Sequence, residues 1–289
     1  MRSALREMNR KQWLVFGATI GALVVFRIVV QFSVPSGDPS SPSPLTPSVI
    51  VRSGFMPLAA ILYGILTYGL LGIVFIVIQG RLPGTKWTKG LRFGTGFCLV
   101  WASYLLEPLP FNTGAKVAAM LAYPLADGSA LLVLGVILGW GLGTDSSAKS
   151  ESRFKADSLA LLVIPALFMA ARYFCYTVLH VYSSFDSRPG ATLMWSADTG
   201  LCLGVLYLWL RPGIEGQSCF ARAAFFTLFV LGINLLLFNS FMILAFADFS
   251  VLDVLVRTVM DVVPVCAGVF LSDAALRYHL RRRMSSQPV

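Results

Sequence analysis

Long apolar runs constrain the fold of this chain more than any other feature. Each contains about 20 residues, which as an α-helix matches the ~30 Å hydrocarbon core of a bilayer. A single segment surrounded by lipid satisfies its backbone hydrogen bonds only by forming a helix. The sequence therefore predicts an all-α, polytopic transmembrane bundle of about eight helices. The predicted helices are Trp13–Phe32, Met56–Ile78, Leu91–Leu106, Val117–Leu142, Leu159–Tyr182, Thr192–Leu210, Ala223–Phe246 and Val251–Tyr278.

The composition agrees with this class of protein. Of the 289 residues, 56% are hydrophobic and only 13% are charged, and the mean hydropathy is +0.74. Soluble domains contain about 25% charged residues. The net charge of +9 does not indicate nucleic-acid binding, because the basic residues gather between the apolar runs rather than on one surface. We therefore expect the lipid bilayer, and not a nucleic acid, to surround or contact the chain.

A short polar stretch, Gln79–Gly94, fixes the predicted orientation. It carries Arg81, Lys86, Lys89 and Arg92 between two apolar runs. Basic residues in short loops stay on the cytoplasmic side of the membrane. With eight crossings in this orientation, 17 of the 23 lysines and arginines lie in cytoplasmic segments, three lie outside and three lie within apolar runs. Both termini are then cytoplasmic, and the expected location is the plasma (inner) membrane.

A weak internal repeat divides the predicted bundle into two halves of four helices. The halves are residues 1–143 and 158–289, and a polar cytoplasmic linker at 144–157 joins them. Shifting the first half by 132 residues aligns seven identical residues in about forty positions. Because each half would cross the membrane an even number of times, the two would be parallel repeats related by an axis along the membrane normal.

Several charged residues lie deep inside the apolar runs, where charge is unfavourable; those considered as ion pairs are Arg27, Arg172, Arg257, Asp127 and Asp261. A charge at the bilayer centre costs about 2.5 to 3.5 kcal/mol on insertion scales, so each needs a partner, water or a route to the interface. The helical rise leaves a vertical gap of about 6 Å between Arg27 or Arg172 and the aspartates, which a long guanidinium side chain spans. We predict the ion pairs Arg27–Asp127 and Arg172–Asp261, with Arg257 as a competitor for Asp261 one turn away.

These pairs have two interpretations. In the first, they only hold helices together. In the second, one or both of Asp127 and Asp261 face an aqueous cavity and bind a cation, a proton or a polar substrate. Pro124 and Pro264 lie three residues from these aspartates, and each proline frees a backbone carbonyl one turn earlier. Such breaks occur both in harmless kinks and in the discontinuous helices of transporters.

A second polar group is predicted toward the external side. Glu107 ends one predicted helix, His180 lies near the end of another, and Asp198 lies a turn or two into the next. The functional hypothesis is a polar vestibule, or an acid–base pair formed by His180 and a carboxylate. The alternative is that these residues are solvated helix ends.

Several classes of chemistry lack their sequence signatures here. The chain contains no H-E-x-x-H, G-x-S-x-G or G-x-x-x-x-G-K-[ST] motif. Its five cysteines show no C-x-x-C spacing, and its two histidines fall at opposite membrane faces of the predicted topology. No lysine lies within an apolar run, which argues against a retinal Schiff base. We therefore predict no metal site and no cofactor.

Three functions remain as hypotheses. The first is a permease for a small solute or ion with a site near the bilayer midplane, at Asp127 and Asp261. The second is a structural or partner subunit, or a homo-oligomer, assembled through glycine-rich helix faces around 135–143 and 200–204 that the monomer leaves unfilled. The third, less favoured, is a lipid-modifying enzyme with an external site built from Glu107, His180 and Asp198.

Overall fold

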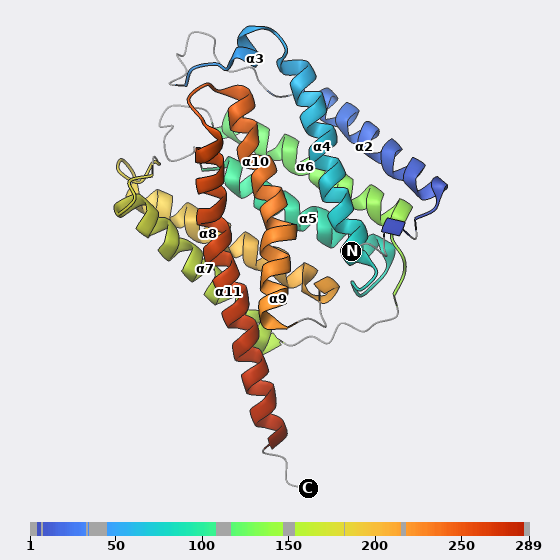
Figure 1. Cartoon of the computed structure of the whole chain (residues 1–289), viewed down its shortest axis with the longest axis vertical. Coiled ribbons are helices and arrows are strands. Elements are labelled where there is room, and N and C mark those ends of the chain that lie inside the picture. Colours follow the sequence, from blue (N-terminus) through green and yellow to red (C-terminus); the bar gives the residue numbers. More distant parts are fainter. Residues whose placement is uncertain are drawn as a thin grey trace.

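The computed structural model describes residues 5–6, 8–32, 34, 45–107, 117–146, 154–181, 183–214 and 218–285, with the side chains of 117–120, 154–157 and 279–285 excepted. Within these residues the chain is all helical, and its β-pairing is limited to two isolated bridges. The helices are α2 (Arg10–Gln31), α3 (Val49–Arg52), α4 (Met56–Gln79), α5 (Lys86–Leu105), α6 (Val117–Leu142), α7 (Phe154–Thr177), α8 (Pro189–Leu210), η2 (Arg211–Ile214), α9 (Cys219–Ala224), η3 (Phe225–Leu231), α10 (Gly232–Ala245) and α11 (Val251–Ser285). Figure 1 shows them as one bundle, in which the last part of α11 extends beyond the other helices.

Seven helices in the described part of the chain are long and apolar enough to cross a membrane. One of them is built from α9, η3 and α10 in succession, where η3 is a π-helical segment. The predicted crossing at Leu91–Leu106 corresponds to α5, which is helical but less apolar, because its first two turns carry Lys86, Lys89 and Arg92. The structure thus supports a membrane-embedded helical protein with seven clear spans.

Helix α5 begins five residues earlier than predicted, inside the polar stretch Gln79–Gly94. The side chain of Thr85 accepts a hydrogen bond from the backbone N–H of Thr88 and caps the new helix. Gly84, just before the cap, has a φ of +104°, a conformation that favours glycine. The predicted break at Pro83 and Gly84 is therefore present, but it is only a few residues long.

The two predicted halves pack against each other rather than forming separate bodies. Helix α5 lies between α6 of the first half and α8 of the second, and α4 packs against α10. Helix α7 begins at Phe154, inside the segment predicted as a linker, and residues 147–153 of that segment lie outside the described residues. The relation between the halves stays a prediction.

Helices α5 and α6 pack closely over an extensive contact, and glycines make this approach possible. A Cβ atom added to Gly90 would lie 2.2 Å from the carbonyl oxygen of Gly135. One added to Gly139 would lie 2.6 Å from the carbonyl oxygen of Lys86. Only residues without a Cβ allow two helix backbones to approach so closely. The glycine-rich face of α6 is thus filled by α5 of the same chain, and Gly200 of α8 is likewise filled by Pro165 of α7.

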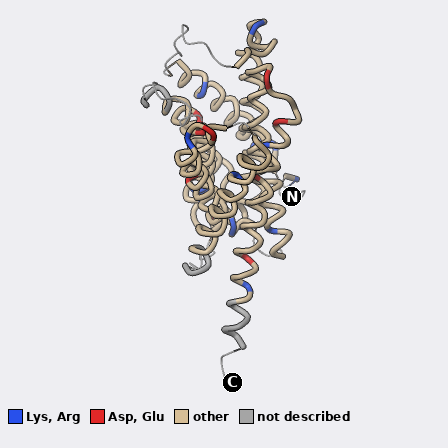
Figure 2. Tube along the Cα trace, turned by 90° about the vertical axis from the view of Figure 1, so that its left-hand side faces the viewer, with Lys and Arg blue, Asp and Glu red and all other residues tan. Residues whose placement is uncertain are grey.

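Lys89, near the start of α5, joins this helix to the C-terminal ends of α4 and α6 on the side predicted to be cytoplasmic. Its side chain is completely buried, and its Nζ donates to the carbonyl oxygen of Gln79 at 2.9 Å and to that of Thr144 at 2.6 Å. These carbonyls lie at the C-terminal ends of α4 and α6, where the helix leaves them without an internal partner. Charged residues are sparse along the helices in general (Figure 2), and this one has a structural role.

We expect Lys89→Met to destabilise the protein by about 2 kcal/mol, because two buried carbonyls lose a charged donor. Reversible unfolding in mixed micelles, followed by tryptophan fluorescence, measures the change. Lys86→Met is the matched control, since the ammonium of Lys86 makes no hydrogen bond or ion pair within the described part of the chain. Equal stability of the two variants would contradict this role for Lys89.

Candidate site around Arg172 and Asp261

Arg172 on α7 is buried inside the bundle together with two carboxylates. Its Nη2 lies 2.7 Å from Oδ2 of Asp261 on α11, and its Nη1 lies 3.5 Å from Oε1 of Glu107, just after α5. Arg172 and Asp261 are 3% and 1% exposed. The predicted Arg172–Asp261 pair is therefore present. It also includes Glu107, which the sequence had suggested for a different, external group.

Two tyrosines complete the hydrogen bonding around this pair. Tyr104 on α5 donates from its hydroxyl to Oδ2 of Asp261 at 3.0 Å, and Arg172 Nη1 donates to the hydroxyl oxygen of Tyr176 at 3.3 Å. Both tyrosines are buried. Tyr176 follows Arg172 by four residues and so lies on the same face of α7. The aspartate thus receives hydrogen bonds from α5 and α7 at once.

Aromatic rings cover the guanidinium group. The Cζ atom of Arg172 lies 5.5 Å from the ring centre of Phe168 and 5.1 Å from that of Trp195 on α8. The Trp195 indole N–H donates to the carbonyl oxygen of Ser103 on α5 at 2.6 Å. Attraction between a cation and an aromatic face is strongest where water is excluded. These rings therefore stabilise the arginine in its charged form at a buried position.

The polar atoms of this cluster are not all satisfied. Both hydrogen bonds to Asp261 end on Oδ2, while the buried Oδ1 has no hydrogen-bond partner among the described residues, and neither does Nε of Arg172. One arginine faces two carboxylates, so with all three ionised the group carries one excess negative charge. Glu107 is the most accessible member, with 21% of its side chain exposed. We call Arg172, Asp261 and Glu107 the Arg172 cluster.

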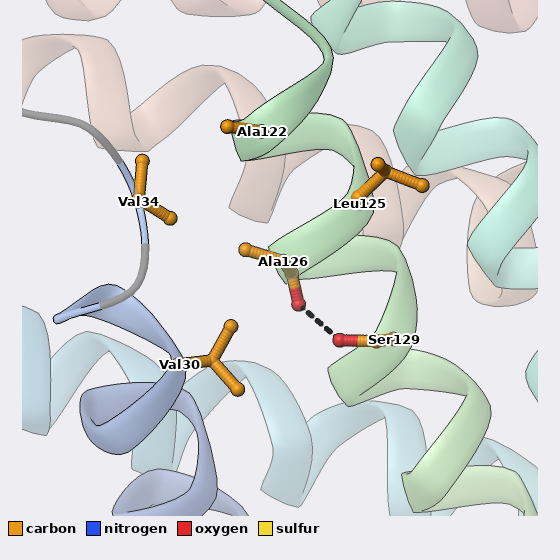
Figure 3. Close-up of a pocket in the computed structure, with 6 residues that line it drawn as sticks. All are labelled: Val30, Val34, Ala122, Leu125, Ala126 and Ser129. Carbon is orange, nitrogen blue, oxygen red and sulfur yellow. Dashed lines mark hydrogen bonds between the residues drawn. The ribbon is translucent and has the colours of Figure 1, made fainter. Parts of the chain in front are cut away.

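The second predicted pair, Arg27–Asp127, is also present, between α2 and α6. Arg27 further donates to Oε1 of Gln31 at 2.9 Å. The two charged side chains are 19% and 25% exposed, so this pair is less enclosed than the Arg172 cluster. Close to this pair in sequence, residues of α6 and of the C-terminal end of α2 with Val34 line a small, mainly apolar hollow of about 210 Å³. In Figure 3, the hollow lies between Val30, Val34, Ala122, Leu125, Ala126 and Ser129.

Three predicted site residues lie elsewhere. Arg257 does not compete for Asp261; its guanidinium stacks 5.7 Å from the ring centre of Phe249, toward the N-terminal end of α11. Arg257 does not reach Asp261 because a half-buried arginine near a helix end extends toward the membrane–water interface rather than into the core. His180 and Asp198 are both exposed, and no hydrogen bond or ion pair joins either of them to Glu107 in the described part of the chain.

Two features were not predicted from the sequence: the aromatic residues around the Arg172 cluster and a second buried ionic group. Asp273 on α11 lies 2.8 Å from Nε of Arg222 and 3.4 Å from Nη2 of Arg211, and all three side chains are buried. An aspartate within the last predicted apolar run was the available signal for this group. Tyr104, by contrast, carries no sequence signal, because its role depends on where the end of α5 lies relative to Asp261.

No group of three or more potential metal ligands occurs among the described residues. The comparisons with known proteins add no relative: no family model, no curated protein and no solved structure matches this chain. The function must therefore be inferred from the geometry alone.

Proposed function

We propose that this protein is a permease for a small solute or ion, and that the Arg172 cluster is its polar site. In this proposal α5 is an eighth crossing, and both termini lie on the cytoplasmic side of a plasma (inner) membrane. The distribution of basic residues supports that orientation. Asp261 lies ten residues after the start of α11, about 15 Å along the helix, which would put it near the middle of the bilayer.

The observation that carries the proposal is the unsatisfied carboxylate oxygen of Asp261. Ionisable residues within membrane helices are rare, and they mark substrate pathways and proton relays when they face an interior. A buried polar atom without a protein partner is suited to receive an ion, a proton or a water molecule. Asp261 Oδ1, with an excess negative charge nearby, fits a site for a proton, a cation or a cationic group of a solute. Glu107, at the more exposed end, would provide the entry.

Irregular helices next to the cluster support movement there. Pro264 lies three residues after Asp261 in α11, and Pro165 lies seven residues before Arg172 in α7. Both prolines remove a helix hydrogen bond and permit bending. The π-helical η3 lies in the adjacent crossing, and π-helical segments often occur at functional sites.

A partner or structural subunit is the second candidate, and a specific observation favours it. Arg172 and Asp261 are sealed by aromatic rings and are nearly inaccessible, which is what a pair that only joins helices requires. The glycine faces do not help this hypothesis, because the helices of the same chain fill them. The enzyme hypothesis has less support, since His180 and Asp198 do not join Glu107.

Mass spectrometry of small molecules retained by the gently purified protein tests the proposal. We expect the wild type and Asp127→Asn to retain a specific polar molecule, and Asp261→Asn to lose it while remaining folded. Asp127→Asn is the matched control because it also removes an arginine-paired carboxylate from an apolar helix. If the wild type carries only bulk lipid, and Asp261→Asn is merely less stable, the subunit hypothesis is preferred.

A further inference from the structure

Asp198 is a carboxylate on the outer surface of a helix that is otherwise suited to lipid. It lies on α8, and its side chain is exposed. Met194 and Leu201, one turn away on either side, are 76% and 44% exposed. The other side of the same turns is buried and includes Ser196 and Thr199. Asp198 therefore points away from the bundle and not toward the Arg172 cluster.

Asp198 lies well inside α8 along the helix axis and is not a residue of the helix end. It is nine residues beyond Pro189, so it lies about 14 Å along α8. Trp195, one turn earlier, already contacts Arg172 and donates to Ser103 in the interior. Asp198 is thus at or beyond the level of the buried cluster. Within a bilayer, a carboxylate at that level on an outer face has neither water nor protein beside it.

The other described carboxylates in the seven apolar helices each have a partner. Asp127 pairs with Arg27, Asp261 with Arg172 and Asp273 with Arg222. Asp253 accepts hydrogen bonds from Ser250. Asp198 alone has neither a hydrogen bond nor an ion pair in the described part of the chain. Since unpaired charge inside a membrane is strongly disfavoured, a cation from outside the described part of the chain would stabilise Asp198.

We propose that Asp198 is the docking point for a transmembrane helix of another protein, which presents a lysine or arginine near the middle of its span. Charge complementarity identifies the occupant, and the exposed Met194 and Leu201 provide apolar contacts above and below the ion pair. A second copy of this chain fits less well. The described arginines that lie away from the ends of its apolar helices are already engaged: Arg27 with Asp127, Arg172 with Asp261, and Arg257 with the ring of Phe249.

Designed helices in liposomes test this proposal without knowledge of the natural partner. The probe is a fluorescent 22-residue leucine–alanine helix with one central lysine, and the readout is energy transfer to the labelled protein. We expect this helix to associate about tenfold more tightly with the wild type than with Asp198→Leu, which is the scale of a polar contact between membrane helices. Helices with a central leucine or glutamate, or with the lysine moved to one end, should not distinguish the two proteins.

Asp186→Leu is the control variant, because Asp186 is also exposed but lies in the turn before α8. It should bind the lysine helix as the wild type does. Asp198→Asn serves as a second variant that keeps the shape of the side chain, and it too should lose binding. Equal association of the lysine helix with wild type and both Asp198 variants would overturn the proposal. So would self-association of the protein alone that Asp198→Leu abolishes, because the partner would then be a second copy.

Discussion

Replacement of Arg172 with methionine should destabilise the protein by about 3–5 kcal/mol, the largest effect that we expect from a single substitution. The substitution leaves the carboxylates of Asp261 and Glu107 facing each other in a buried environment, without the cation that both contact. Removing one partner of a buried ion pair is far more harmful than replacing the whole pair, because the remaining charge stays desolvated. The measurement is the free energy of unfolding in mixed micelles.

Arg257→Met is the matched control for this experiment. Arg257 also lies within an apolar helix, but it is only partly buried and stacks on Phe249 rather than pairing with a carboxylate. Its loss should change stability by less than about 1 kcal/mol. The double variant Arg172→Met/Asp261→Leu should recover part of the lost stability, since one stranded carboxylate is removed. Equal losses from Arg172→Met and Arg257→Met would show that the cluster does not hold the helices.

The intramembrane pairs could be predicted because burial in lipid leaves few options for a charge. Helical rise places Arg27 near the depth of Asp127, and Arg172 near that of Asp261, and both pairs are present. Depth and helix face alone do not give the direction in which a long side chain extends, however. Arg257 and Asp261 are four residues apart and share a face of α11. Asp261 nevertheless pairs with Arg172 of α7, whereas Arg257 lies nearer the helix end and extends to the ring of Phe249.

The hypothetical external group does not assemble in the described structure, where His180 and Asp198 are exposed as the alternative of solvated helix ends expects. Glu107, His180 and Asp198 belong to three different segments, and their convergence depends on the packing of those segments. The structure brings Glu107 to Arg172, whereas His180 and Asp198 are exposed. Helix boundaries were predicted more reliably, because capping and apolar length are local. Three helices still differ from their predicted bounds by five residues or more. Helix α5 starts five residues early because of an unrecognised cap at Thr85. Helix α7 starts and ends five residues earlier than predicted, and α11 continues to Ser285.

Glycine spacing alone does not identify which helix faces are in close contact. Gly17 and Gly21 on α2 have the spacing typical of a packed face. A Cβ atom added to either would nevertheless meet nothing within 4 Å. Gly135 on α6, in contrast, lies against the backbone of α5. The difference depends on which faces the neighbouring helices present, and this is a property of the assembled bundle. Gly21, with open space around it, therefore serves as a control in a test of the α5–α6 contact.

Substitution of Gly135 by alanine should destabilise the protein by about 3 kcal/mol, at the upper end of the usual range for overpacking. The added Cβ would lie 2.3 Å from the carbonyl oxygen of Gly90 and 2.5 Å from the backbone nitrogen of Gly94. Backbone atoms cannot rotate away as a flexible side chain does, so α5 and α6 must separate. Thermal unfolding in detergent measures the loss.

Gly21→Ala is the matched control, because it places the same methyl group in an open position of another apolar helix. There the better helix propensity of alanine, worth about 1 kcal/mol, should leave stability unchanged or slightly raised. Gly90→Ala should resemble Gly135→Ala, since its Cβ would lie 2.2 Å from the carbonyl oxygen of Gly135. The double variant should lose less than the sum of the two single losses, because the first methyl group already separates the helices. Fully additive losses, or a loss for Gly21→Ala equal to that for Gly135→Ala, would contradict close α5–α6 packing as the cause.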